Sequence, residues 1–157
     1  MKTEKEKLSL NDEFRLLYIL VMRIGQDVTD KEMQEDKDFN HLLDLWIQSI
    51  FSINRMIPEI VDDMIHRIDS VKKNNSFDCK NIDCIYVNSA FEMIMNLPSI
   101  INETQNRLSE TISDINFGSM ILNCSQYTDT NIKLIKSSTY YDTMVRIHNM
   151  YVEDNEE

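Results

Sequence analysis

The sequence predicts an all-α protein, a helical bundle whose five to seven helices are long, amphipathic and heptad-patterned. One observation is that the 157 residues include only two glycines and two prolines. Sheet-rich folds and phosphate-binding loops need more glycine, for turns and for close backbone approach. The other is that apolar residues recur at alternating spacings of four and three in two long segments, a pattern that only a helix places on one side. A chain of this length is expected to form one domain with a substantial core.

The first helix is predicted to start near Asn11, which is a suitable N-cap, and to stop at Gly25. Residues 1–9 are rich in charge and are expected to be a frayed N-terminus. Leu16, Ile19 and Leu20 broaden the apolar face of this helix. Its inward positions keep the four-and-three spacing: Leu10, Phe14, Leu17, Val21, Ile24 and Val28.

An acidic connection follows at residues 30–38. Thr29 and Glu32 have the spacing of a capping box, which predicts a short helix or turn there. The negative charge of this segment is typical of a solvated linker and also of an acidic docking segment, and the sequence leaves both open.

The longest pattern predicts a central helix over residues 39–71. Arg67 is its one polar inward residue, and the adjacent Ile68 can replace that contact. Apolar residues also occupy the e and g positions, where a two-stranded coiled coil carries charges. So wide a face favours the central helix of a bundle over an intermolecular coiled coil. Pro58 is expected to kink this helix or to split it into two stacked helices. The inward positions are Phe39, Leu43, Trp46, Ile50, Ile53, Ile57, Ile60, Met64, Arg67 and Val71.

Shorter helices are predicted in the second half of the chain. After a loop at 72–83, Asp83 is a candidate cap for a helix from Cys84 to Asn96. Pro98 is expected to open the next helix at its first turn, and Asn116–Ser119 to bend or end it. The last helical segments are expected at 130–135 and 140–152, so that one domain spans 10–152 and an acidic tail occupies 153–157. The helix opened by Pro98 is expected to direct Ile101, Leu108, Ile112 and Ile115 inward.

The charge of the chain argues against several kinds of partner. A net charge of −11 and a pI near 4.7 disfavour a nucleic-acid backbone or an anionic lipid surface. The longest apolar run within the amphipathic first helix, Leu16 to Met22, is far shorter than the ~20 residues of a membrane span. Three cysteines are too few for a disulfide scaffold. We therefore expect a soluble, intracellular protein of the cytoplasm or nucleus with no membrane span.

No motif for chemistry is recognisable. His41, His66 and His148 fall on separate predicted helices, and no cysteine or histidine has zinc-site spacing from another. Nucleophile-elbow, phosphate-loop and dinucleotide-binding patterns are absent from the sequence. The prediction is a non-enzyme with no cofactor, no metal and no small-molecule substrate. The ten methionines are expected to fill the core, and Trp46 is interpreted as a core residue rather than an interface anchor.

Two short segments carry a resemblance. Val21–Asp27 resembles the BH3 segment of the Bcl-2 family, and Ile115–Leu122 resembles its BH1 segment. Ser119 stands where that family has arginine, and the BH3-like segment falls in the first predicted helix rather than the second. The resemblance implies a small helical bundle, of a kind that viruses also encode, which binds an amphipathic helix of a host regulator of apoptosis or signalling.

The patterns favour a non-enzymatic α-helical adaptor or a subunit of an intracellular multiprotein assembly, which acts through helix–helix packing. Its partners are expected to be proteins, including a second copy in a homo-oligomer, bound through amphipathic helices. The alternative is the Bcl-2-like bundle with a groove for a partner's helix. The candidate interface residues are Leu17, Val21, Ile24, Trp46, Ile50, Ile53, Ile57, Ile60 and Met64.

Overall fold

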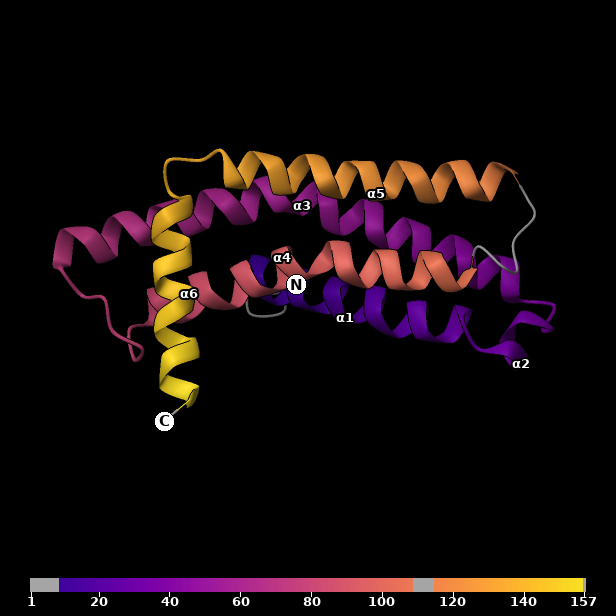
Figure 1. Cartoon of the computed structure of the whole chain (residues 1–157), viewed down its shortest axis with the longest axis horizontal. Coiled ribbons are helices and arrows are strands. Elements are labelled where there is room, and N and C mark those ends of the chain that lie inside the picture. Colours follow the sequence, from indigo (N-terminus) through magenta and orange to yellow (C-terminus); the bar gives the residue numbers. More distant parts are fainter. Residues whose placement is uncertain (1–8, 109–114, 157) are drawn as a thin grey trace, which may run out of the picture. The chain divides into compact units, whose positions relative to one another are not determined.

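The computed structural model describes residues 9–108 and 115–156. These ranges contain six helices and no strand, which confirms the predicted all-α bundle (Figure 1). The predicted frayed start lies outside the described residues, apart from Ser9, as does Ile112. By its contacts the chain divides into two compact units, and the single domain over 10–152 stays a prediction. The helices are α1 (Leu10–Val28), α2 (Lys31–Gln34), α3 (Phe39–Asn74), α4 (Ile82–Leu108), α5 (Ile115–Lys136) and α6 (Tyr141–Glu156).

The first two helices are capped one or two residues away from the predicted positions. Ser9 caps α1, because its Oγ accepts the backbone N–H of Asp12 at 3.2 Å, so Asn11 is already helical. The predicted stop at Gly25 is wrong, since α1 continues to Val28. Asp30 rather than Thr29 caps α2, with its carboxylate accepting the N–H of Glu32 at 3.0 Å. The hydroxyl of Thr29 instead donates back to Gln26 O, which is a common alternative for this residue type.

Both prolines lie inside continuous helices. α3 passes through Pro58 without splitting, so of the two alternatives for this residue only the continuous helix is found. The prediction that Pro98 opens a new helix is wrong, because one helix, α4, runs from Ile82 to Leu108. Ile94 and Leu97 before this proline and Ile101 after it are all buried. Burial of the same face on both sides offsets the hydrogen bond that each proline removes.

The remaining helix ends also differ in detail from the prediction. Asn81, not Asp83, caps α4, because its side-chain oxygen accepts the N–H of Cys84 at 3.1 Å. The segment Asn116–Ser119 neither bends nor ends a helix, since it forms part of the start of α5. The predicted helix at 130–135 is the end of α5, and α6 continues through residues 153–156 of the predicted acidic tail.

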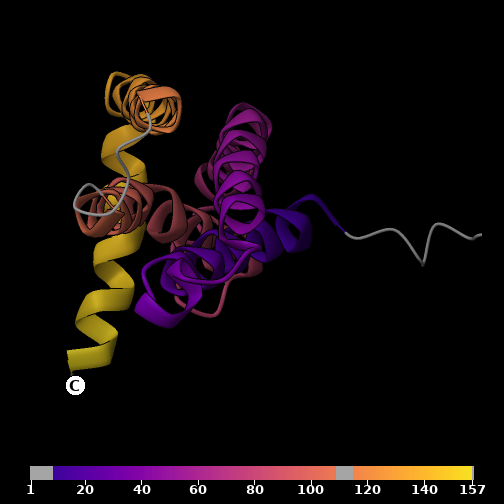
Figure 2. The same ribbon diagram turned by 90° about the vertical axis from the view of Figure 1, so that its right-hand side faces the viewer.

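The first unit comprises α1, α2, α3 up to Met56, and the parts of α4 and α5 at 96–108 and 115–130. Figure 2 views α3, α4 and α5 nearly end-on. Trp46 of α3 is fully buried, and its indole Nε1 donates to Val21 O of α1 at 3.2 Å. Predicted inward residues of three helices are buried in the same unit: Phe14, Val21, Val28, Leu43, Ile50, Ile53, Ile101 and Leu108.

A buried polar pair joins α3 to α5 in this unit. The amide of Asn54, which has no solvent exposure, donates to Thr128 Oγ1 at 2.8 Å and to Ile50 O at 2.9 Å. The hydroxyl of Thr128 in turn donates to Cys124 O at 3.0 Å. A buried polar group is costly unless it is hydrogen-bonded, so this pair fixes how α5 lies along α3.

The second unit comprises the rest of α3, the first part of α4, the end of α5, and α6. α6 crosses the other helices of this unit at a steep angle (Figure 1). Tyr140, immediately before α6, donates its hydroxyl proton to the carboxylate of Asp69 on α3 at 3.0 Å. The core of this unit consists of apolar side chains from α3, α4, α5 and α6, among them Ile57, Ile60, Met64, Ile68, Val71, Val87, Ala90, Ile94, Ile135, Met144 and Ile147.

The two glycines give a matched test of the packing. A Cβ at Gly25 would lie 2.9 Å from Thr104 Oγ1 and 3.1 Å from Trp46 Nε1, whereas a Cβ at Gly118 meets nothing within 4 Å. Gly25→Ala should therefore lower the free energy of unfolding by about 1 kcal/mol, although alanine favours a helix by a similar amount. Gly118→Ala should raise it by about 0.5–1 kcal/mol. Urea unfolding followed by circular dichroism measures both, and stabilisation by Gly25→Ala would contradict the close α1–α4 approach.

Candidate protein-interaction surface

Most of the predicted interface residues lie in the core of their own unit. Leu17 and Ile24 are half-buried, and the others have at most 2% of their surface exposed. A side chain buried to this extent has no surface to offer while its unit keeps this fold. The interpretation of Trp46 as a core residue agrees with its complete burial. The fully or almost fully buried members are Val21, Trp46, Ile50, Ile53, Ile57, Ile60 and Met64.

Four other apolar side chains of α1 are exposed; one is Met22, at 37%, and the remaining three share one side of the helix. Leu16 is 48% exposed, Ile19 40% and Leu20 38%. At about 100° per residue they project away from the side of α1 that carries the buried Phe14 and Val21. They were expected to broaden the inward face, but the structure places them on the opposite side. We call these three residues the outer stripe of α1.

Exposed charges lie at both ends of the outer stripe. Asp12 and Glu13 lie in the first turn of α1, and Arg23 lies one turn beyond Leu20; all three are exposed. Along the outer side of α1 the order is therefore acidic, apolar and basic, and the acidic Asp27 follows in the last turn. Such charged flanks around an apolar centre are typical of protein interfaces, where the apolar part supplies affinity and the charges supply orientation.

A small cleft opens between α1 and α4 in the same unit. Its volume is about 240 Å³, which is below the usual range for small-molecule sites. Gly25 allows the two helices to approach, and the Glu103–Arg107 ion pair, at 3.0 Å, lies on its α4 side. The cleft has room for about one side chain of a partner. Its lining residues are Met22, Gly25, Gln26, Thr29, Ile100, Glu103, Thr104 and Arg107.

α4 has exposed apolar residues in the second unit. Ile82 and Ile85, in its first two turns, are both exposed. Within the described ranges, α4 is also the one helix long and apolar enough to span a membrane by length and composition, and half of the relevant window is buried. A core helix of a soluble protein passes the same test, so this finding decides neither for nor against a membrane.

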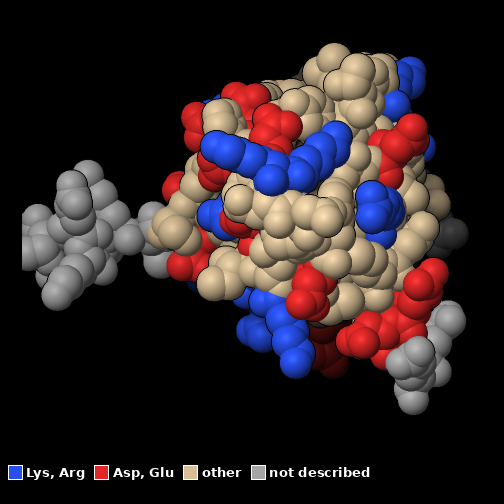
Figure 3. All heavy atoms as spheres, turned by 90° about the vertical axis from the view of Figure 1, so that its left-hand side faces the viewer, with Lys and Arg blue, Asp and Glu red and all other residues tan. Residues whose placement is uncertain are grey.

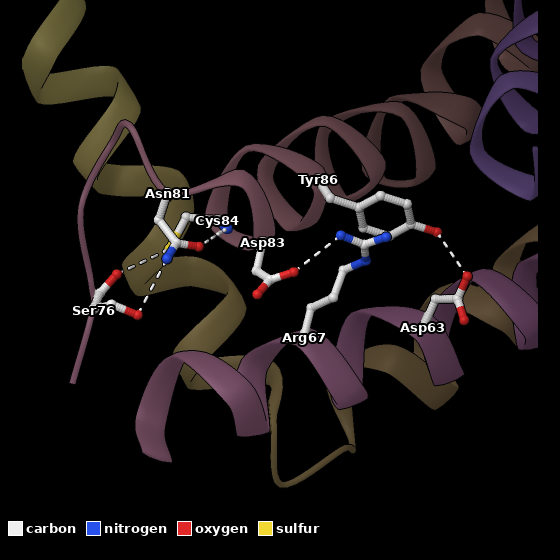
Figure 4. A network of polar contacts seen from close by, with 7 residues as sticks. All are labelled: Asp63, Arg67, Ser76, Asn81, Asp83, Cys84 and Tyr86. Carbon is white, nitrogen blue, oxygen red and sulfur yellow. Dashed lines mark hydrogen bonds and ion pairs between the residues drawn. The ribbon is translucent and has the colours of Figure 1, made fainter. Parts of the chain in front are cut away.

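A polar cluster joins α3 to α4 in the second unit (Figure 4). The guanidinium of Arg67 forms an ion pair with Asp83 at 3.0 Å and stacks over the ring of Tyr86, with 3.9 Å to the ring centroid. The hydroxyl of Tyr86 donates to Asp63 at 3.2 Å. The adjacent Ile68 is fully buried, as its predicted replacement of the Arg67 contact requires. We call Asp63, Arg67, Asp83 and Tyr86 the polar clamp.

Tyr86 and the three cysteines have raised pKa values, which disfavour their use as nucleophiles. Burial, and then the charge and hydrogen bond of Asp63, raise the pKa of Tyr86 to about 12. Burial likewise raises the pKa of Cys124 to about 12, and it is the main cause of the raised pKa of the Cys79 and Cys84 thiols. Thiols with a raised pKa are largely protonated at neutral pH and make poor nucleophiles.

The histidines make contacts of different kinds. His148 of α6 lies with Nδ1 3.0 Å from Asn88 Oδ1 and 3.4 Å from Glu92 Oε1, and its ring packs on Phe91. His66 Nδ1 lies 2.7 Å from the backbone oxygen of Asp62. Across residues 9–108 and 115–156, no three His, Cys, Asp or Glu side chains are grouped as a metal site would require.

Charges of both signs share the face seen in Figure 3, with uncharged surface between them. The basic side chains there form one short band and several separate groups, with acidic side chains beside them.

No protein-family model, curated protein or solved structure matches this chain. The Bcl-2 resemblance rests on the two short segments alone. In the structure, Val21 and Gly25 of the BH3-like segment are buried within the first unit, and the BH1-like segment forms the first turns of α5. The BH3-like face of α1 is therefore covered by helices of this chain.

The sequence contains a signal for the outer stripe in addition to the heptad pattern. Leu16, Ile19 and Leu20 are displaced by roughly half a turn of the helix from Phe14 and Val21. A single helix cannot direct both sets to the same core. The angular gap between the two sets alone indicated a second apolar face.

The raised pKa of Tyr86 predicts an alkaline loss of stability. A tyrosine whose pKa rises from 10.0 to about 12 on folding stabilises the fold fully below pH 10, and this contribution is lost as pH rises through 12. Tyr86→Phe should cost about 1 kcal/mol at pH 7, because the bond to Asp63 is lost. Between pH 9 and pH 12 wild type should lose about 2 kcal/mol of stability relative to the variant, so the difference should change sign and Tyr86→Phe should become the more stable of the two.

Tyr127→Phe is the control for this experiment, since its ring packs on Phe51 in the first unit and it has no part in the polar clamp. Urea unfolding across the pH range measures both variants. A cost of Tyr86→Phe that stays constant up to pH 12 would contradict the proposed effect of burial and of Asp63.

Proposed function

We propose that the protein is a non-enzymatic α-helical adaptor, or a subunit of an intracellular multiprotein assembly, that acts through helix–helix packing. The outer stripe of α1 is the observation that carries this proposal. Leu16, Ile19 and Leu20 lie on adjacent turns and face away from the core. Their exposure therefore has no role in holding the first unit together, and a partner helix that covered them would gain apolar burial.

The size of the outer stripe fits one helix of a partner. Single exposed apolar residues are ordinary on protein surfaces, but three on consecutive turns form the i, i+3, i+4 pattern by which helices bind one another. Covering their exposed area contributes roughly 1 kcal/mol each. The charges at either end would then select the orientation of the partner helix. The strongly negative net charge supports a protein partner over a nucleic acid.

Replacing the outer stripe tests this function. Leu16→Gln, Ile19→Gln and Leu20→Gln together remove the apolar surface with residues that tolerate a helix. The variant should keep its unfolding free energy within about 1 kcal/mol of wild type, but its partners should fall at least tenfold in affinity purification from native cells quantified by mass spectrometry. The matched control is Leu134→Gln, at another exposed apolar residue, which should retain them. Equal recovery with both variants would contradict a role for the outer stripe.

A Bcl-2-like bundle that binds an amphipathic helix is the second candidate. The α1–α4 cleft favours it, because apolar Met22 and Ile100 and the polar pair Glu103–Arg107 line a surface recess. Apolar helical peptides with an anchor residue should then shift the NMR signals of Gly25 and Thr104 at micromolar concentration. Saturation without any shift at these two residues would place the peptide elsewhere and contradict this candidate.

A further inference from the structure

We propose that the outer stripe of α1 binds the same stripe of a second copy of this chain, with the two α1 helices antiparallel. This inference rests on the proposed function, since it names the occupant of the proposed surface. Its basis is the order of exposed residues along one side of α1: Asp12 and Glu13, then Leu16, Ile19 and Leu20, then Arg23.

The charge order selects the direction of the pair. In a parallel pair of α1 helices, the acidic ends would meet each other and Arg23 would meet Arg23 of the partner subunit, so that like charges adjoin at both ends. In an antiparallel pair, the acidic end of each copy meets the basic end of the other. The positive N-terminus of each helix then also lies beside the negative C-terminus of its neighbour.

In one register of the antiparallel pair, apolar residues lie opposite apolar residues and an acidic residue lies opposite a basic one. When the twofold axis passes near Tyr18, Leu16 lies opposite Leu20 of the partner subunit, and Glu13 lies opposite Arg23 of the partner subunit. Moving the axis about two residues toward the C-terminus would place Leu16 against Arg23. Moving it two residues toward the N-terminus would place Asp12 against Leu20. The twofold symmetry repeats each favourable contact, as in other isologous dimers.

Asp27 gains a favourable position in the same register. It is exposed in the last turn of α1 and would lie near the first turn of the partner copy, whose cap is Ser9. A carboxylate is stabilised beside a helix N-terminus. This attraction opposes the repulsion between Asp27 and the acidic residues of the same first turn, Asp12 and Glu13.

The small apolar area of the outer stripe limits the affinity of the two copies for each other. Stable dimers bury about 1,200–2,000 Å² in total, and three partly exposed side chains per copy supply only a fraction of that. A dissociation constant on the order of 10–100 μM is expected. Self-pairing of this strength becomes significant where copies are concentrated, as inside an assembly.

Charge reversal tests the direction and the register together. Glu13→Arg and Arg23→Glu should each weaken self-association about tenfold, because every dimer then contains two like-charge contacts. An equimolar mixture of these two variants should associate about as well as wild type, since each contact again joins opposite charges. The double variant E13R/R23E should do the same. Sedimentation equilibrium up to several hundred micromolar measures the constants, and circular dichroism verifies folding.

Arg55→Glu is the control for net charge, because Arg55 is exposed on α3, and it should leave the constant unchanged within about twofold. A wild-type chain that stays monomeric throughout would overturn self-pairing but not the proposed function, which the glutamine variant tests separately. Single variants that associate like wild type, together with a mixture that associates more tightly, would indicate a parallel pair and overturn the antiparallel register. Association insensitive to every reversal would place the contact on another surface.

Discussion

Burial of one face of α3 is the constraint on which the structure depends. This helix contributes to both compact units, and its inward residues have almost no solvent exposure from Leu43 to Val71, with Arg67 the exception. Each fully buried isoleucine stabilises the fold by roughly 1.5–3 kcal/mol, so the sum far exceeds the hydrogen bond that Pro58 removes. The continuity of α3 follows from this balance, and the same balance keeps α4 continuous through Pro98.

The heptad pattern was sufficient to predict the helical class and most of the core, and the expected range of five to seven helices includes the six found in the described residues. It did not predict helix ends, because these depend on competition between neighbouring side chains for a few backbone groups. Ser9 caps α1 in place of Asn11, and Asp30 caps α2 in place of Thr29. Gly118 illustrates a related limit: glycine permits a turn without requiring one, and in α5 it lies inside a helix.

The candidate surface was harder to predict than the core. A count of apolar residues assigns Leu16 and Leu20 to the interior. Their angular offset from Phe14 and Val21 indicates a second apolar face, but which of the two faces is covered depends on the neighbouring helices. The polar clamp had a clearer signal, since Arg67 breaks an otherwise apolar series. Its partners Asp83 and Tyr86 come from another helix, however, and their approach depends on how α3 and α4 pack. Contacts between helices are decided by tertiary packing, which spacing along one helix does not record.

The hydrogen bond between Asn54 and Thr128 restricts which helices can pack beside α3 in the first unit. If another helix with only apolar side chains at that level replaced α5, Asn54 would lose its hydrogen bond to Thr128, and water could not replace it because Asn54 is fully buried. Serine or threonine at the matching height would preserve it. If two copies exchanged their α5 helices by domain swapping, each Asn54 would keep a threonine as its hydrogen-bond partner. An unrelated amphipathic helix without that hydroxyl would lower the stability of the unit.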